Sequence, residues 1–257
     1  MLEIIPFWEQ LEEYTALAEQ YGLAFEYNDF YVPDLLDNSA LLKERIRIYQ
    51  SLDRPKRVDT MHGVFFDILP FSYDNGIRKQ SVYRMHQSIE IAEALGCKGV
   101  VFHTNLAPLL LSGEKYRNNW LERMHKTIAE LLSESECEIY LENMFDRSPN
   151  ELADLAAELQ GEDRFGICLD IAHMRLATDT PREWFNVLAS HIKHFHFNDT
   201  YLQFDDHLAL GQGNIDWAEI EALIGEFNLK DKNRLIEVNG LEKIHQSLEY
   251  CQRAGIK

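Results

Sequence analysis

Eight short runs of apolar, β-branched and aromatic residues recur along this chain, and longer amphipathic segments separate them. The runs cover residues 2–5, 24–27, 58–62, 99–103, 138–142, 165–170, 192–197 and 234–238. Apolar residues recur at helical spacing between the runs, for example at Ile89, Ala92 and Leu95, after which Gly96 provides a helix end. Alternating strands and helices are typical of parallel βα units, and eight units predict an α/β fold, a closed (β/α)8 TIM barrel.

An open, doubly wound sheet is the alternative arrangement of the same elements. That fold usually carries a glycine-rich phosphate-binding turn after its first strand, and this sequence has no such turn there. No linker or low-complexity tract divides the 257 residues. We therefore expect a single domain over residues 1–257.

The composition predicts a soluble globular protein. Hydrophobic residues make up 46% of the chain, and no apolar run approaches the roughly 20 residues of a membrane helix. Residues 1–6 lack the features of a secretory signal, so the expected location is cytoplasmic. The four cysteines lie far apart and form no CxxC pair, which predicts buried free thiols.

Polar side chains that can bind a metal end six of the predicted strands. In chain order they are His62, His103, Glu142, Asp170, His196 and Glu237. The carboxyl ends of barrel strands meet at one mouth, and charged groups buried there need a common counter-charge. Three carboxylates with three imidazoles suit Zn, Mn, Co or Fe better than Ca. The sequence therefore predicts a divalent metal site, with Zn or Mn as the expected ion.

Two further segments supply donors for the same mouth. His173 follows Asp170 after about one helical turn, a spacing that can bring both side chains to one site. Asp205 and His207 precede a Gly-x-Gly loop at residues 211–213, whose bare backbone would allow a ligand to approach closely. A tight solvated turn is the alternative interpretation of that loop.

With these residues in place, the chain resembles the xylose isomerase-like superfamily of barrels. That superfamily includes sugar-phosphate isomerases and epimerases, and also endonuclease IV-type abasic-site nucleases. The resemblance covers nearly the whole chain and is most specific at residues 166–173 and 196–217. In the isomerase and epimerase branch, it implies one metal, with two glutamates flanking the substrate carbon. The implied ligands are Glu142, Asp170, His196 and Glu237.

The nuclease branch implies three metals instead, so the resemblance allows one to three ions. The three implied ligand sets are His62, His103 and Glu142; Glu142, Asp170, His196 and Glu237; and His173, Asp205 and His207. The ligands alone do not choose between the branches. However, the loop at residues 28–34 carries acids and no base, and the net charge is -18, so nucleic acid is an unlikely partner.

Our leading prediction for function is interconversion of a sugar or sugar-phosphate, in which the metal polarises a carbonyl and proton transfer passes through a metal-bound enediolate. Glu142 and Glu237 are the candidate bases, because removing and returning a proton on opposite faces needs two carboxylates across the substrate. His173 is a third candidate catalytic residue, to orient or shuttle.

Candidates for substrate binding include charged, polar and aromatic side chains. They are His62, Asn143, Arg147 and Arg175 as polar contacts, and Trp8, Tyr27, Phe65 and Phe66 as pocket walls. The two arginines could grip a phosphate or carboxylate, or form a solvated surface pair. Core packing is the alternative role of the aromatics.

Three other functions remain open at this stage. A metal-dependent phosphodiester hydrolase, such as an abasic-site nuclease, is the main alternative. A lyase acting on a cyclic polyol and a non-catalytic metal-bearing scaffold are the others. We expect no membrane partner, and the sequence leaves assembly into a homo-oligomer open.

Overall fold

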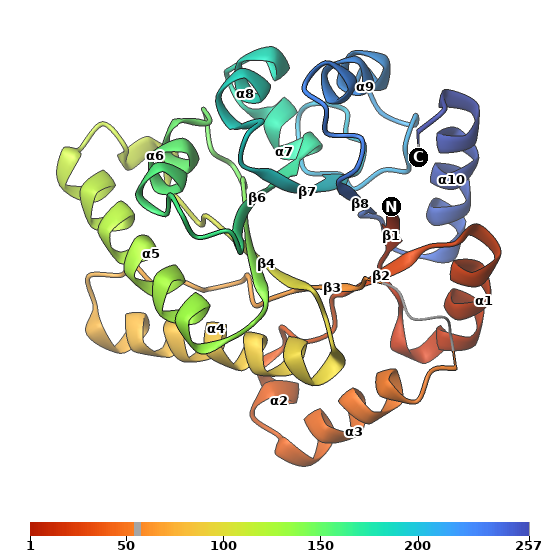
Figure 1. Ribbon diagram of the computed structural model, residues 1–257, viewed down its shortest axis with the longest axis horizontal. Coiled ribbons are helices and arrows are strands. Elements are labelled where there is room, and N and C mark those ends of the chain that lie inside the picture. Colours follow the sequence, from red (N-terminus) through yellow and green to blue (C-terminus); the bar gives the residue numbers. More distant parts are fainter. Residues whose placement is uncertain (54–57, 257) are drawn as a thin grey trace.

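The computed structural model describes residues 1–53 and 58–256, and eight parallel strands in this part of the chain close into one barrel. Each strand pairs with the next, and β8 returns to pair with β1. The strands are β1 (Leu2–Ile4), β2 (Ala24–Tyr27), β3 (Thr60–His62), β4 (Gly99–His103), β5 (Glu138–Glu142), β6 (Phe165–Asp170), β7 (Ile192–Phe197) and β8 (Asn233–Ile236). They form the central ring of Figure 1, with the helices outside. The predicted (β/α)8 TIM barrel is confirmed.

The helices form the outer layer, and short polar signals set their ends. They are α1 (Leu11–Tyr21), α2 (Pro33–Leu36), α3 (Ser39–Gln50), α4 (Asn75–Leu95), α5 (Glu114–Glu134), α6 (Asn150–Glu158), α7 (Ile171–Leu176), α8 (Pro181–Leu188), α9 (Trp217–Glu226) and α10 (Leu241–Ala254), with the 3-10 turns η1 (Trp8–Gln10) and η2 (Pro108–Leu110). Asp74 and Asp216 accept backbone N–H groups where α4 and α9 begin. Gly96, at φ 73°, ends α4 as predicted.

The bounds of three strands differ from the sequence prediction. β1 ends at Ile4 rather than Ile5, because Pro6 offers no N–H to continue the ladder. β3 begins at Thr60, and Val58 is exposed. β8 ends at Ile236, so Glu237 lies one residue beyond the strand, although its N–H still donates to the Phe197 carbonyl at 2.9 Å.

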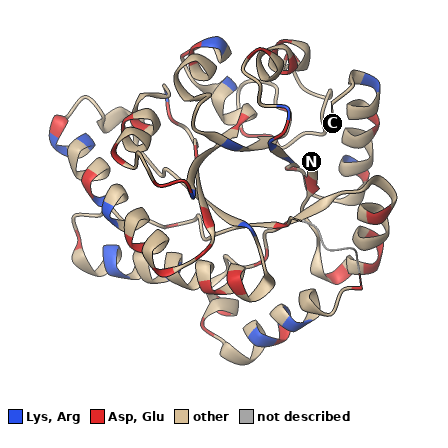
Figure 2. Ribbon diagram, viewed as in Figure 1, with Lys and Arg blue, Asp and Glu red and all other residues tan. Residues whose placement is uncertain are grey.

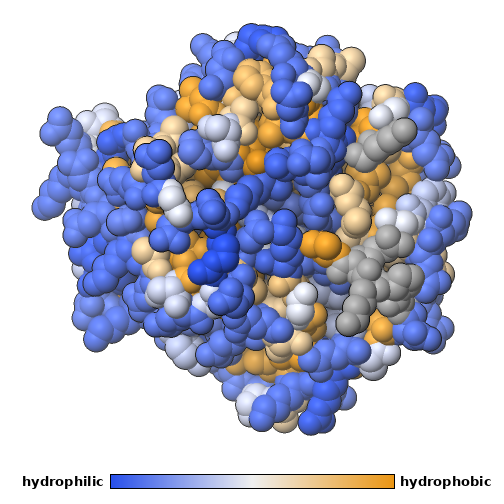
Figure 3. All heavy atoms as spheres, in the orientation of Figure 1, coloured by the Kyte–Doolittle hydropathy of each residue, from blue (hydrophilic) through white to orange (hydrophobic). Residues whose placement is uncertain are grey.

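The main hydrophobic core lies between the barrel and the helices. Trp120, Trp184 and Phe25 are completely buried there, and burying each such side chain contributes about 1.5–3 kcal/mol. All four cysteines are free and buried, as predicted. The face drawn in Figure 3 is hydrophilic over most of its area, with smaller apolar patches. Within the described residues, no helix combines the length and apolar character needed to cross a membrane.

The inside of the barrel is polar, and acidic positions lie on the strands as well as on the outer helices (Figure 2). Residues two apart on a strand point to the same side of it. The register of β4 and β5 places Val101 beside Tyr140 and His103 beside Glu142, so all four side chains share one face. β4 and β5 therefore each send one side chain to mid-barrel and a second to the mouth.

Candidate metal centre

Four strands bring four fully or almost fully buried donors together at the mouth. Glu142 ends β5, Asp170 ends β6, His196 lies on β7 and Glu237 follows β8. One ligand atom from each residue lies within 4.8 Å of the others. This is the four-residue group that the resemblance implies for one metal.

The junction of β6 and α7 explains why His173 joins this group. The Asp170 side chain accepts the His173 backbone N–H at 2.5 Å and so caps the first turn of α7. The His173 Nδ1 atom then lies 2.9 Å from the Asn143 carbonyl, and its Nε2 atom lies 3.3 Å from an Asp205 oxygen. The predicted pairing of Asp170 and His173 in one site is thus present in the structure.

Histidines from β3 and β4 complete a second group around Glu142. The Nε2 atoms of His62 and His103 lie 3.4 and 3.3 Å from Glu142 Oε2, and 3.2 Å from each other. His173 Nδ1 and His196 Nδ1 approach the same carboxylate at 3.4 and 3.2 Å. Glu142 therefore lies on the floor of the mouth, enclosed by imidazole rings.

The third group depends on the long loop between β7 and α9. Asp205 and His207 lie on this loop, with His207 Nε2 3.1 Å from Asp205 Oδ2, and they form a candidate ligand group with His173. His207 has φ 44°, a left-handed backbone conformation that is uncommon outside glycine and often marks functional sites. Its Nδ1 atom contacts the Glu237 carbonyl at 3.0 Å, which ties the loop to the end of β8.

Asp199, which the sequence analysis gave no role, organises that loop. It is completely buried, and its two carboxylate oxygens accept the backbone N–H groups of Thr200, Gly211 and Ile215 and the indole N–H of Trp217. A Cβ atom on Gly213 would lie 2.3 Å from an Asp199 oxygen. The Gly-x-Gly segment therefore allows the chain to pack closely against itself, and it does not line the pocket described below.

The hydrogen-bonding state of these donors fits a metal. Among the described residues, neither oxygen of Glu142 nor the Nδ1 atom of His196 has a hydrogen-bond partner, although all three atoms are buried. Leaving buried polar atoms unpaired is costly unless a ligand satisfies them. The mixed nitrogen and oxygen donors suit Zn or Mn, as predicted, but do not identify the ion.

Electrostatics couples the carboxylates and imidazoles. Burial opposes ionisation of Glu142, but the positive charges of His196 and His103 outweigh it and hold the pKa of Glu142 well below its usual value. Burial also acts to lower the pKa of His207, but Asp205 and Glu237 raise it to about 10. In the absence of a metal, the opposite charges of these groups offset one another in part as ion pairs.

A pocket of about 390 Å³ opens above the donors. Its lining includes Glu237, His62, His103, His173, Asp205 and His207, but no lysine or arginine among the described residues. Phe65 and Phe66 line it as predicted, together with Phe7 and Tyr31. Trp8 lies in a neighbouring depression instead, and the Tyr27 hydroxyl is committed to Asp59 at 2.9 Å.

Three predicted substrate contacts lie elsewhere. The Asn143 amide is buried and exchanges hydrogen bonds with the Asp170 backbone at 2.8 and 3.0 Å, so it positions a candidate ligand. Arg147 is exposed, and Arg175 is partly buried. None of the three lines the pocket, because the side chains beyond β5 and β6 leave the mouth at these positions.

Sequence reasoning missed two polar residues that support the site. Asn198 donates to Asp170 at 3.0 Å and to Glu237 at 3.3 Å. Glu26 on β2 is completely buried and approaches both His194 and His196. The available signal for Glu26 was a carboxylate inside an otherwise apolar strand. The prediction considered residues at the ends of strands, and Glu26 does not end β2.

A family model for the xylose isomerase-like TIM barrel matches residues 15–254, so the chain belongs to this family. An uncharacterized protein of Methanocaldococcus jannaschii, MJ1311, is 28% identical over 215 residues, which cover 77% of this chain and 72% of that protein. The TTHB071 protein from Thermus thermophilus, a structure soaked with ZnCl2, superposes with a TM-score of 0.74 at 23% identity, covering 98% of this chain and 97% of the other. A D-tagatose 3-epimerase-like protein superposes with a TM-score of 0.79 at 22% identity, covering 98% and 96%. These two likenesses establish the fold.

Proposed function

We propose that this member of the xylose isomerase-like TIM barrel family is a divalent-metal-dependent isomerase or epimerase that acts on an uncharged sugar. The observation that carries the proposal is the four-residue donor group at the floor of the pocket. One of its members, Glu237, lines the pocket, whose walls include aromatic rings. The structural likeness to a D-tagatose 3-epimerase-like protein supports the same class of reaction.

Glu142, Asp170, His196 and Glu237 would hold the metal. When bound, a divalent ion supplies Lewis acidity towards a carbonyl and its neighbouring hydroxyl, which acidifies the C–H bond between them. Zn or Mn fits this donor set. The chain's own task is then to move a proton to and from that carbon.

Glu237 is the proposed base. Its side chain is 7% exposed and lines the pocket, whereas Glu142 is fully buried beneath the imidazoles and does not. His173 also lines the pocket, so we assign it to carrying the proton on the substrate's other side, with Nδ1 held by the Asn143 carbonyl. Glu142 only binds the ion in this scheme, whereas the sequence analysis predicted it both as a ligand and as a base.

The pocket walls favour an uncharged substrate. Among the described residues, no lysine or arginine lines the pocket, whereas the carboxylates of Asp29, Asp205 and Glu237 do. A phosphate would therefore find no guanidinium or ammonium group to bind it. Phe65, Phe66 and Tyr31 offer flat apolar surfaces on which the C–H face of a sugar ring can lie.

The test is exchange of a substrate C–H hydrogen in deuterated water, measured by NMR across a panel of uncharged sugars with Zn or Mn present. We expect Glu237→Gln to slow exchange by at least about 10²-fold, since the amide cannot take up the proton. Glu19→Gln, on the exposed side of α1, is the matched control and should behave as wild type. Unchanged exchange in Glu237→Gln would contradict the assignment.

A metal-dependent phosphodiester hydrolase is the second candidate, and one observation favours it. All three ligand groups implied by the nuclease branch are assembled in the structure. Three divalent ions would outweigh the carboxylates and attract a phosphate. Elemental analysis giving about three ions per chain, with nicking of a duplex that carries one abasic site, would favour the hydrolase over the isomerase.

A further inference from the structure

We propose that Glu26 is a positioning residue for the metal centre: its carboxylate fixes the His196 ring so that Nδ1 faces the ion. Glu26 lies on β2 at mid-barrel, and sequence reasoning assigned it nothing. The inference rests on the proposed metal site, but not on the proposed sugar reaction.

The contacts of Glu26 account for both of its oxygens. Oε1 lies 3.1 Å from His196 Nε2, and Oε2 lies 2.9 Å from His194 Nε2 and 2.7 Å from the Thr60 hydroxyl. His196 Nε2 and Glu26 Oε1 lie at ion-pair distance, and neither atom makes a hydrogen bond among the described residues. Both side chains are completely buried, so water does not compete for this pair.

Three of the other four site histidines are oriented in the opposite sense. The Nδ1 atoms of His62, His173 and His207 lie 2.9, 2.9 and 3.0 Å from backbone carbonyls, which leaves each Nε2 lone pair for the mouth. His196 instead turns Nδ1 to the mouth, 3.2 Å from Glu142 and 3.4 Å from Glu237. A metal-binding imidazole needs an acceptor for its other N–H, and a carboxylate also makes the ring a stronger donor.

The carboxylate is itself held by a partner further down the barrel. The Thr60 hydroxyl lies 2.6 Å from Glu3 and 2.7 Å from Glu26. One hydroxyl has one hydrogen, so it donates to one carboxylate and accepts from the other carboxyl group, which must be protonated. Burial and the nearby Glu26 raise the pKa of Glu3 well above its usual value, so Glu3 is the protonated partner. Asn233 donates to the far oxygen of Glu3 and closes the network. Glu26 is thereby fixed in place from below.

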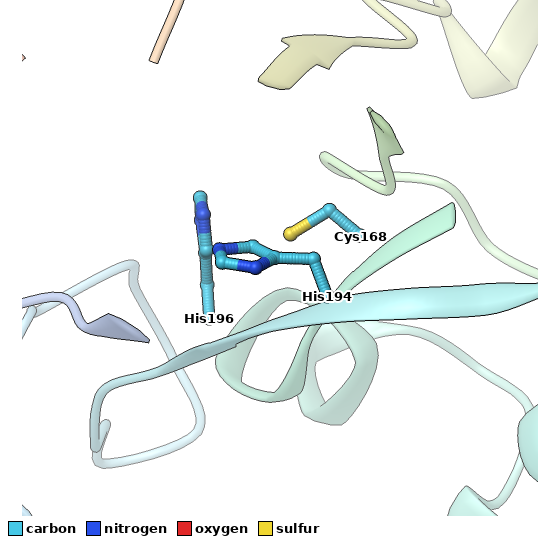
Figure 4. A group of neighbouring side chains, drawn as sticks. All are labelled: Cys168, His194 and His196. Carbon is cyan, nitrogen blue, oxygen red and sulfur yellow. The ribbon is translucent and has the colours of Figure 1, made fainter. Parts of the chain in front are cut away.

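A competing interpretation is a second metal site inside the barrel. The side chains of Cys168, His194 and His196 converge in Figure 4, and their donor atoms lie within 4.8 Å of one another. The Nε2 atoms of both histidines, however, face the oxygens of Glu26. The geometry therefore favours two imidazoles facing one carboxylate, with a hydrogen-bond contact from His194 and an ion-pair contact from His196.

The test compares Glu26→Gln with Glu3→Gln in the full chain. An amide has one acceptor oxygen, which should stay with the two donors His194 and Thr60. Its NH2 group then faces His196 Nε2, which must give up its hydrogen, so Nδ1 carries the proton and cannot bind the ion. We expect Glu26→Gln to weaken Zn binding by about 10–100-fold. Glu3→Gln should leave it unchanged, because the amide can still donate to the Thr60 hydroxyl and accept from Asn233.

Competition with a chromophoric chelator measures the Zn affinity, and ¹⁵N NMR of the Zn-loaded protein reports which His196 nitrogen is bound. Equal melting temperatures of the two variants would exclude a general folding defect. Wild-type affinity in Glu26→Gln, equal weakening in Glu3→Gln, or no Zn binding by the wild type would each overturn the proposal. So would loss of an ion in Cys168→Ser, which we expect to bind Zn as wild type does.

The two proposals fail separately. Weaker Zn binding in Glu26→Gln, in a protein that exchanges no sugar hydrogen, would support the positioning role and overturn the proposed reaction. Unchanged Zn binding in that variant, together with sugar turnover in the wild type, would overturn the positioning role and support the proposed reaction.

Discussion

Buried carboxylates and histidines lie both at the mouth of the barrel and in the interior just below it. The two regions differ in how these side chains are hydrogen-bonded. In the interior, Glu3, Glu26 and Thr60 bond to one another and to His194 and Asn233. At the mouth, both oxygens of Glu142 lack a hydrogen-bond partner among the described residues, although imidazoles surround them. Three of the four carboxylate oxygens of Glu3 and Glu26 make hydrogen bonds, whereas neither oxygen of Glu142 does, so the mouth leaves more donor atoms for a ligand.

Stability and function therefore divide along the barrel axis. Buried carboxylates cost several kcal/mol unless they are paired, and the interior residues meet that cost among themselves. The mouth meets it only partly, through ion pairs such as His103 with Glu142 at 3.3 Å. A metal would replace these pairs, so substitutions in the two regions should separate ion binding from folding.

The largest expected effect is on ion binding by Glu142→Gln. Glu142 belongs to two of the candidate ligand groups. Loss of a residue that only supports a ligand weakens metal binding by up to about 10²-fold, so loss of Glu142 should weaken Zn binding by more than that. Titration against a competing chelator measures this. Wild-type affinity in the variant would remove the distinction between mouth and interior.

The next effect is stabilisation by the ion. Free Zn at 1,000 times its Kd should raise the free energy of unfolding by about 4.1 kcal/mol, because it binds only the folded chain. Chemical denaturation with and without Zn measures the increment. Glu142→Gln should lose most of it and Glu3→Gln should keep it. Equal increments in both variants would mean that the ion binds elsewhere.

The smallest effect concerns Asp146, a buried acid near the mouth whose Oδ2 atom is hydrogen-bonded and whose Oδ1 atom has no hydrogen-bond partner among the described residues. Thr104 and the Met144 N–H donate to it at 2.7 and 2.8 Å, yet burial raises its pKa to about 6. A raised pKa in the folded state means that folding favours the protonated acid. Stability from this group is therefore complete below pH 4 and is lost as the pH rises through 6.

The loss amounts to about 3 kcal/mol, and Asp146→Asn should lack it. The measurement is the free energy of unfolding of metal-free protein between pH 4 and 7, with the variant and the wild type compared at each pH. Parallel curves for the two proteins would show that Asp146 is not the titrating group.

The sequence by itself determined the barrel and the residues at its mouth. Side chains alternate between the two faces of a strand, and a residue at the C-terminal end of a barrel strand lies at the mouth. His62, His103, Glu142, Asp170 and His196 were therefore found without knowledge of any tertiary contact. Their convergence follows from closing a parallel barrel. Glu237 was found as well, although its strand ends two residues earlier than expected.

Only the tertiary structure decided the positions of residues that do not end a strand. Arg147 and Arg175 follow strands but leave the pocket, because a loop's path depends on contacts distant in sequence. Phe7 and Tyr31 line the pocket for the same reason. Glu26 does not end its strand, and its partners Thr60 and His194 lie 34 and 168 residues away. Local pattern shows a buried charge there, but only the closed barrel supplies the groups that pair with it.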